Sequence, residues 1–388
     1  MAPPVLMGCR GDDRDVRCMR ARGRRVIFYG ERETSASAWR REGLKWYILL
    51  HPQGLSGYCP NGLMPRRAGR CEMSVVAVTG CSGYIGSRLL HFMDRSDKVE
   101  KILGIDLNPP RYQSPKLDFQ RLDVRDPRLT NLFVLNEVQT VVHLAFIVNP
   151  LHDDRLMHDI DVNGTRNVLA ATAACGARHL IIASSSSAFG AFPDNPEWLT
   201  EKDHPRRMPN YTYASDKYEV EMICRLFKDD HPEVKMALVR PCIVYGPNVD
   251  NYLSRFIIRL PFFPVVGNER PEMQFVHEDD TAEVFMRVLE LEAEGFFHAC
   301  GEGTINVEEI AQLAGKRLIP LPPAIAYPAI DLLWKLRAPL IEGPSGMLDF
   351  IRYRWTISDA LTREALGLGP RMSSREVVKL MIETHRQG

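Results

Sequence analysis

From residue 73 onward, short runs of β-branched residues alternate with longer stretches in which apolar residues recur every three or four positions. The short runs are typical of parallel strands buried on both faces, and the longer stretches predict amphipathic helices. The pattern therefore predicts an α/β fold with a doubly wound parallel sheet. Strands are expected at Val75–Val78, Ile102–Asp106, Phe119–Leu122, Val141–Leu144, Leu180–Ser184 and Met236–Arg240.

Beyond Pro241 the alternation gives way to short elements separated by many prolines. This change predicts a smaller, irregular lobe over residues 242–388, packed against the carboxyl edge of the sheet that residues 73–241 form. Open α/β sheets bind their ligands at that edge, so the lobe is expected to hold the substrate.

Residues 1–72 have a different composition, rich in arginine, with Lys45 as the one lysine and with Gly, Pro and Cys interrupting every periodicity. No folded domain is evident there. A basic arm for nucleic acid or membrane is disfavoured because the arginines do not line one helical face. Of the two other interpretations, a disordered extension and translation that starts at Met73, we favour the second, because the first clear strand begins two residues after Met73.

The composition excludes several classes of protein. The 388 residues carry a formal net charge of zero, so nothing global indicates a nucleic-acid partner. No apolar run approaches the roughly 20 residues needed to span a bilayer. The nine cysteines lack metal-ligand spacing, and no secretory signal is present. These features predict a cytoplasmic protein with reduced thiols, no integral membrane segment and a small-molecule substrate.

A glycine-rich segment, Thr79–Gly86, directly follows the first strand and opens a helix. Glycines at this spacing allow a tight turn and let the backbone approach a pyrophosphate, while the helix N-terminus offers N–H groups to the phosphates. Asp106 ends the second strand 20 residues beyond Gly86, where a carboxylate accepts hydrogen bonds from a ribose 2′-OH and repels a 2′-phosphate. We therefore expect a Rossmann-type domain that binds NAD, although nearby Arg111 keeps NADP open.

Candidate catalytic residues lie on a helix that follows Asn210. Tyr213 and Lys217 are four positions apart and so share a helix face, where the Lys217 ammonium can lower the pKa of the Tyr213 phenol. The strand Leu180–Ser184 runs into a hydroxyl cluster, Ser184–Ser187, that can hold a substrate hydroxyl against Tyr213. The same helix has an apolar stripe, which consists of Val220, Ile223, Cys224 and Phe227.

These motifs together resemble the extended short-chain dehydrogenases/reductases, in particular the nucleotide-sugar epimerases and dehydratases. Further matches occur in order at Leu122–Val124, His143–Ala145, Val162–Thr165, Phe189-Gly190, Arg240-Pro241, Tyr245–Pro247, Phe275–His277 and Asp279-Asp280. The resemblance implies a catalytic set of Ser185, Tyr213 and Lys217, with Asn163 supporting a water network behind Lys217. It implies cofactor contacts from Gly80, Gly83, Tyr84, Ile85, Gly86, Asp106, Asp123, Val124, Leu144, Ala145, Tyr213, Lys217 and Pro241.

Departures from the family pattern bear on the substrate. Ser186 and Ser187 replace the Asp-Glu pair that serves water elimination in the dehydratases, which disfavours that reaction. Ile243 and Met273 replace an Asn and an Arg that help to hold the nucleotide diphosphate in galactose-type epimerases. Replacement cations are sought among Arg255, Arg259, Arg270, Arg352 and Arg354, whereas Phe146, Phe262 and Phe263 are candidates for the lining of a more apolar pocket.

Two other segments invite a separate interpretation. The acidic residues of His277–Asp280 are expected to cap a helix that begins near Thr281, rather than to bind a metal. The apolar stretch Leu321–Leu336 fits a helix of the substrate lobe, a dimer contact or a peripheral membrane contact.

The leading functional hypothesis is an NAD-dependent epimerase or oxidoreductase that acts on a secondary alcohol of a sugar or nucleotide-sugar, with Tyr213 as general base. A dehydrogenase or reductase of an apolar, sterol-like or flavonoid-like substrate is the enzymatic alternative. The non-enzymatic alternative is a redox-sensing module that binds NAD without turnover. Each of these hypotheses is compatible with a homodimer.

Overall fold

The computed structural model describes residues 7–8, 15–21, 24–30, 74–339 and 341–387, and the chain divides into two compact units, residues 1–70 and 71–388. In the first unit, β1 (Met7–Gly8), β2 (Asp15–Ala21) and β3 (Arg24–Gly30) pair antiparallel, although the sequence predicted no strands there. The remainder of the expected extension, including Met73, lies outside the described residues.

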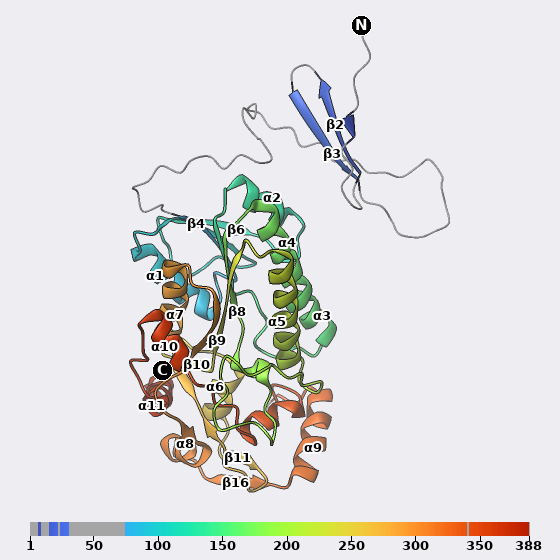
Figure 1. The fold of residues 1–388 in the computed structure, drawn as a ribbon. Helices are drawn as coiled ribbons and strands as arrows, with labels where there is room; N and C mark the ends of the chain where they lie inside the picture. The colour runs from blue at the N-terminus through green and yellow to red at the C-terminus, as the bar shows by residue number, and fades with distance from the viewer. Residues whose placement is uncertain (1–6, 9–14, 22–23, 31–73, 340, 388) are drawn as a thin grey trace, which may run out of the picture. The chain divides into compact units, whose positions relative to one another are not determined.

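A parallel sheet of seven strands forms the centre of the second unit (Figure 1). Its order, β14-β9-β8-β7-β4-β5-β6, changes direction between β4 and β7 and confirms the predicted doubly wound α/β fold. The six expected strands all occur, as β4 (Ser74–Thr79), β5 (Val99–Asp106), β6 (Leu117–Arg121), β7 (Thr140–His143), β8 (His179–Ala183) and β9 (Lys235–Pro241).

Alternate residues of the strands point to opposite faces of the sheet and pack in two separate hydrophobic cores. Val76 and Val78 pack with α1 (Tyr84–Arg95) and α7 (Glu278–Leu291) on one face of the sheet. Ala77 packs on the other face, together with helices α2 (Arg128–Leu135), α4 (Gly164–Cys175) and α5 (Thr212–Asp230). The predicted stripe of α5 is confirmed, because all four of its residues are buried in this second core.

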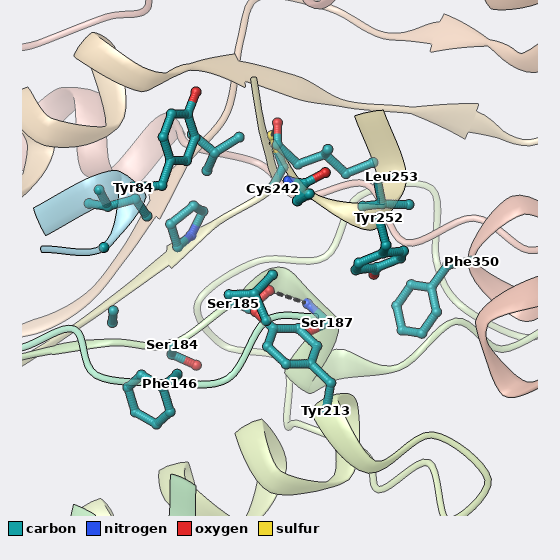
Figure 2. Close-up of a pocket in the computed structure, with 18 of the residues that line it drawn as sticks. Tyr84, Phe146, Ser184, Ser185, Ser187, Tyr213, Cys242, Tyr252, Leu253 and Phe350 are labelled. Carbon is teal, nitrogen blue, oxygen red and sulfur yellow. Dashed lines mark hydrogen bonds between the residues drawn. The ribbon is translucent and has the colours of Figure 1, made fainter. Parts of the chain in front are cut away.

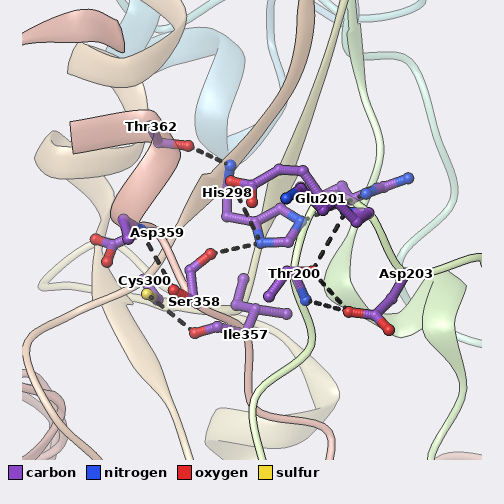
Figure 3. Close-up of polar contacts among 12 residues, drawn as sticks. Thr200, Glu201, Asp203, His298, Cys300, Ile357, Ser358, Asp359 and Thr362 are labelled. Atoms are coloured by element: carbon purple, nitrogen blue, oxygen red, sulfur yellow. Dashed lines mark hydrogen bonds and ion pairs between the residues drawn. The ribbon is translucent and has the colours of Figure 1, made fainter. Parts of the chain in front are cut away.

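The seventh strand, β14 (Gly295–Ala299), corrects the expectation that the sheet ends before residue 242. Its sequence contains no β-branched residue, so the signal used for the other strands is absent. The C-terminal segment holds this strand in place (Figure 3): the His298 N–H donates to Thr362 Oγ1 at 2.7 Å, and the His298 ring Nδ1 donates to the Ser358 carbonyl at 2.8 Å.

Apart from α7 and β14, which belong to the sheet layers, the chain beyond β9 forms mostly short elements. Its strands pair two by two: β10 (Ile243–Tyr245) with β13 (Phe275–His277), β11 (Phe263–Val266) with β16 (Leu318–Leu321), and β12 (Glu272–Met273) with β15 (Ile305–Asn306). Its helices are α6 (Tyr252–Arg259), α8 (Val307–Ala314), α9 (Pro323–Lys335), η3 (Ser345–Ile351), α10 (Ala360–Leu366) and α11 (Ser374–Gln387). In the part of the chain that the structure describes, every helix is too short or too polar to cross a membrane.

Candidate active site

The turn between β4 and α1 leaves backbone uncovered at the carboxyl edge of the sheet. Gly80 has φ +72°, and a Cβ there would lie 2.6 Å from the Ala145 nitrogen. A Cβ on Gly86 would lie 2.2 Å from the Gly80 carbonyl oxygen, so neither position accepts a side chain. Because α1 begins at Tyr84, its first N–H groups face this turn, and the arrangement fits the pyrophosphate of a dinucleotide.

Asp106 lies beside this turn at the end of β5. Its carboxylate accepts the Ser82 N–H at 3.0 Å and the Leu107 N–H at 2.7 Å, which fixes its position at the strand end. Asp123, another expected cofactor contact, forms an ion pair with Arg125 at 2.7 Å, and that hydrogen-bonded guanidinium lowers the pKa of the Asp123 carboxyl. Val124 is buried.

The hydroxyl cluster and Tyr213 face one pocket from two elements (Figure 2). Ser185 precedes the short helix η2 (Ser186–Phe189), and its Oγ accepts the Ser187 N–H at 3.1 Å. Tyr213, in the first turn of α5, lies opposite. Burial raises the pKa of Tyr213 well above its usual value, and hydrogen bonding to Ser185 acts in the opposite direction. Gly80, Gly83, Tyr84, Ile85, Gly86, Leu144 and Pro241 line the same pocket.

Lys217 is buried on the same face of α5, but it does not line the pocket. Its Nζ donates to the Ala183 carbonyl at 2.6 Å and lies 3.1 Å from the centroid of the Phe146 ring, which does line the pocket. The distance from Nζ to the Tyr213 ring centroid is 5.8 Å. Burial lowers the pKa of Lys217 to about 7, and the Asp161 carboxylate opposes this shift. The two largest influences on the pKa of Tyr213 are burial, which raises it, and the hydrogen bond with Ser185, which lowers it.

The residue expected to support Lys217, Asn163, does not lie behind it. The Asn163 side chain is exposed and donates to Asp159 Oδ1 at 2.8 Å. The reason is the π-helical turn Asp159–Asn163, whose wider winding changes the residues that face inward.

Asp161 faces inward in place of Asn163, and sequence reasoning missed it. Its side chain is 1 % exposed, Oδ1 accepts the Ile147 N–H at 2.8 Å, and Oδ2 has no hydrogen-bond partner among the described residues. Burial raises the pKa of Asp161 to about 7, and the Lys217 charge opposes that rise. Asp161 and Lys217 thus form a buried, electrostatically linked pair.

Most of the other described residues that line the pocket are apolar. Ile243 and Met273, the two departures from the family pattern, both line it, as Phe146 does, while Phe262 and Phe263 do not. Among the described residues that line the pocket, none is Lys or Arg. The other lining side chains are Val148, Tyr211, Cys242, Val244, Asn251, Tyr252, Leu253, Met347, Phe350, Ile351 and Trp355.

The arginines considered as replacement cations are engaged elsewhere. Arg255 pairs with Glu342 and Asp250, and Arg352 pairs with Glu269 at 3.2 Å. Arg270 and Arg354 pair with Glu308 and Glu197, and Arg259 is exposed outside the pocket. No substitute for the missing diphosphate contacts therefore lines the described pocket.

The segment His277–Asp280 opens helix α7. The helix starts at Glu278, earlier than expected, and its N-cap is His277, whose Nδ1 accepts the Asp279 N–H at 3.2 Å. The acidic residues lie in the first helical turn, where carboxylates interact favourably with the helix dipole. Arg88 of α1, the helix that follows the glycine turn, donates a hydrogen bond to Asp279 and so links α1 to α7.

Comparison with known proteins now identifies the class of protein. The model of the NAD dependent epimerase/dehydratase family matches residues 76–299, more than half of the chain. The chain therefore belongs to the NAD dependent epimerase/dehydratase family, and its cofactor is NAD.

Individual relatives are distant. An uncharacterised protein, y4nG, of Sinorhizobium fredii is 28% identical over 320 residues, which cover 79% of this chain and 77% of that protein. UDP-glucose 4-epimerase 2 of Oryza sativa is 31% identical over 194 residues, or 46% of this chain and 47% of the relative. The structure of a Thermus thermophilus UDP-glucose 4-epimerase complex with NAD superposes with a TM-score of 0.61 at 21% identity, covering 80% and 99% of the two chains, and shares the fold.

The Asp161–Lys217 pair gives a prediction about pKa. Asp161→Asn removes a buried countercharge, so the charged form of Lys217 becomes less favourable and its pKa falls below the value of about 7 in the natural chain. Side-chain NMR titration of Lys217 measures this shift. Asn163→Ala is the matched control, because the exposed Asn163 is expected to leave that pKa unchanged; a larger shift in the control would contradict the assignment of Asp161.

Proposed function

We propose that this protein is an NAD-dependent oxidoreductase that interconverts a secondary alcohol and a ketone in an apolar substrate. The observation that carries the proposal is the pocket itself, in which Ser185 and Tyr213 face each other beside the glycine turn while most of the other lining side chains are apolar.

Each polar residue has a distinct role in the proposed reaction. The glycine turn would hold NAD, whose nicotinamide would supply hydride transfer from the carbinol carbon or, in the reduced form, to the carbonyl carbon. Tyr213 takes the hydroxyl proton in the oxidation and returns it in the reduction. Ser185 holds the substrate oxygen near the Tyr213 hydroxyl, and its own orientation is supported by the Ser187 N–H.

Lys217 and Asp161 act from behind Tyr213. A charged Lys217 on the same helix face favours the phenolate form of Tyr213 through its positive charge. Asp161 in turn favours the charged form of Lys217. Burial raises the pKa of Asp161 and lowers the pKa of Lys217, and the charge of each residue opposes the shift of the other.

The lining of the pocket favours an apolar substrate over a nucleotide diphosphate. A diphosphate bound away from water needs cations or several N–H donors, because burying unpaired charge is costly. Ile243 and Met273 supply neither, and the five arginines considered for this task are exposed or paired with carboxylates.

Epimerisation of a nucleotide-sugar is the second candidate, and the family itself favours it. The rice relative is named a UDP-glucose 4-epimerase, and an Escherichia coli O157:H7 relative, 28% identical over 185 residues, is named for a sugar joined through a diphosphate to undecaprenol. A redox-sensing module without turnover is disfavoured, because Ser185, Tyr213 and Lys217 are all present.

A first prediction concerns the proton-transferring group. Tyr213→Phe keeps the ring and its packing but removes the hydroxyl, so turnover should fall on the order of 10²–10⁴-fold while NAD binding is retained. Steady-state kinetics and cofactor titration measure the two effects. Tyr218→Phe makes the same change on α5 at a residue outside the pocket and should be harmless. Undiminished turnover in Tyr213→Phe would refute the proposed mechanism.

A second prediction separates the two candidate reactions. The purified protein is supplied with NAD and, in parallel, with a series of secondary alcohols of increasing apolar bulk and with UDP-glucose. We expect NADH to accumulate with the bulky apolar alcohols in proportion to ketone formed, and UDP-glucose to remain unchanged. Inversion of UDP-glucose to UDP-galactose without accumulation of NADH would instead establish the nucleotide-sugar epimerase.

A further inference from the structure

Helix α9 exposes a row of large apolar side chains that the proposed chemistry does not use. Ile325 and Leu332 of α9 are 64% and 58% exposed, and Leu336, the C-cap of the helix, is 69% exposed. Their spacing of seven and four residues places them on one side of the helix, and we call these three residues the α9 stripe. Leu226 on α5 is exposed without another exposed large apolar residue one helical turn away, whereas three such residues on one side of a helix indicate a contact surface.

The opposite side of α9 is fixed to the protein. Tyr327 donates a hydrogen bond to Asp349 of η3 at 2.5 Å, and Asp331 accepts the Ser345 N–H at 3.0 Å. The Trp334 ring stacks on His152 with centroids 3.7 Å apart. Figure 1 shows α9 at the outer edge of the lobe. The α9 stripe is thus held outward by specific contacts on the inner side of the helix.

Two cations lie at the C-terminal end of the stripe. Lys335 and Arg337 are both exposed there, and neither forms an ion pair with a described residue. Asp331 is the acidic residue of α9, and its carboxylate faces the inner side, toward Ser345. The outward side of α9 is therefore apolar, with two cations at its C-terminal end.

We propose that α9 docks on the surface of a membrane that contains anionic lipids. Interfacial helices combine an apolar face, which enters the boundary between headgroups and acyl chains, with Lys and Arg side chains that contact lipid phosphates. At 13 residues, α9 is suited to lie along such a surface and not to cross it. A second copy of the chain is the alternative occupant of this surface, and light scattering distinguishes it from a membrane.

Vesicle flotation with the full-length protein tests the proposal. We expect the protein to float with phosphatidylcholine vesicles that contain phosphatidylglycerol, to float less with phosphatidylcholine alone, and to be released by high salt. Leu332→Ser/Leu336→Ser should weaken binding roughly tenfold or more, because two side chains no longer enter the apolar layer. Lys335→Gln/Arg337→Gln should weaken binding about fivefold per cation at low salt.

Leu226→Ser is the matched control, since it removes an equally exposed leucine from another helix and should leave flotation unchanged. Circular dichroism of each variant checks that the fold is retained. Absence of flotation with the anionic vesicles, or equal flotation of the Leu332→Ser/Leu336→Ser variant, would overturn the proposal. So would a dimer in light scattering that this double variant dissociates, which would make a second copy the occupant. Vesicle binding requires no substrate, so its outcome is independent of the proposed reaction.

Discussion

A fully buried ion pair between Glu221 and Arg240 joins the helix that carries Tyr213 to β9, the strand beside the edge strand β14. Neither side chain is exposed, and the guanidinium forms two hydrogen bonds to the carboxylate, at 2.8 and 2.6 Å. A buried charge without a partner is costly, so each residue of the pair depends on the other. Glu221 also accepts the Ser184 hydroxyl at 2.5 Å, next to Ser185. One carboxylate thus links α5, the end of β8 and β9.

The position of the active-site groups depends on this link. Tyr213 and Lys217 lie two turns and one turn before Glu221 on α5, so a helix held at Glu221 presents both residues at a fixed distance from the serine cluster. His298 completes the surroundings of Arg240: burial lowers the pKa of the imidazole to about 3, and its neutral Nε2 lies 3.4 Å from the guanidinium. The seventh strand therefore contributes to the site although it lies at the edge of the sheet.

The sequence predicted those features that follow from local chemistry. The glycine turn, six strands, the stripe of α5 and the family were all evident, because each rests on neighbouring residues with a fixed period. Features that depend on tertiary context were not evident from the sequence. The strand Gly295–Ala299 lacks β-branched residues and forms against β9, and the π-helical turn that directs Asp161 inward and Asn163 outward leaves no trace in a 3.6-residue period. The arginines form ion pairs with residues distant in sequence, such as Glu342 for Arg255, and these pairs were not predictable from the sequence.

Unfolding of Glu221→Gln in urea tests the central constraint most directly. The change is nearly isosteric but leaves Arg240 without its buried countercharge, so the account predicts a loss of roughly 3–5 kcal/mol in the free energy of unfolding, together with lower turnover. Glu219→Gln is the control on the same helix, because Glu219 forms a partly exposed pair with Arg166 at 3.4 Å, and pairs of that kind contribute about 0–1 kcal/mol. Equal stability of the two variants would contradict the account.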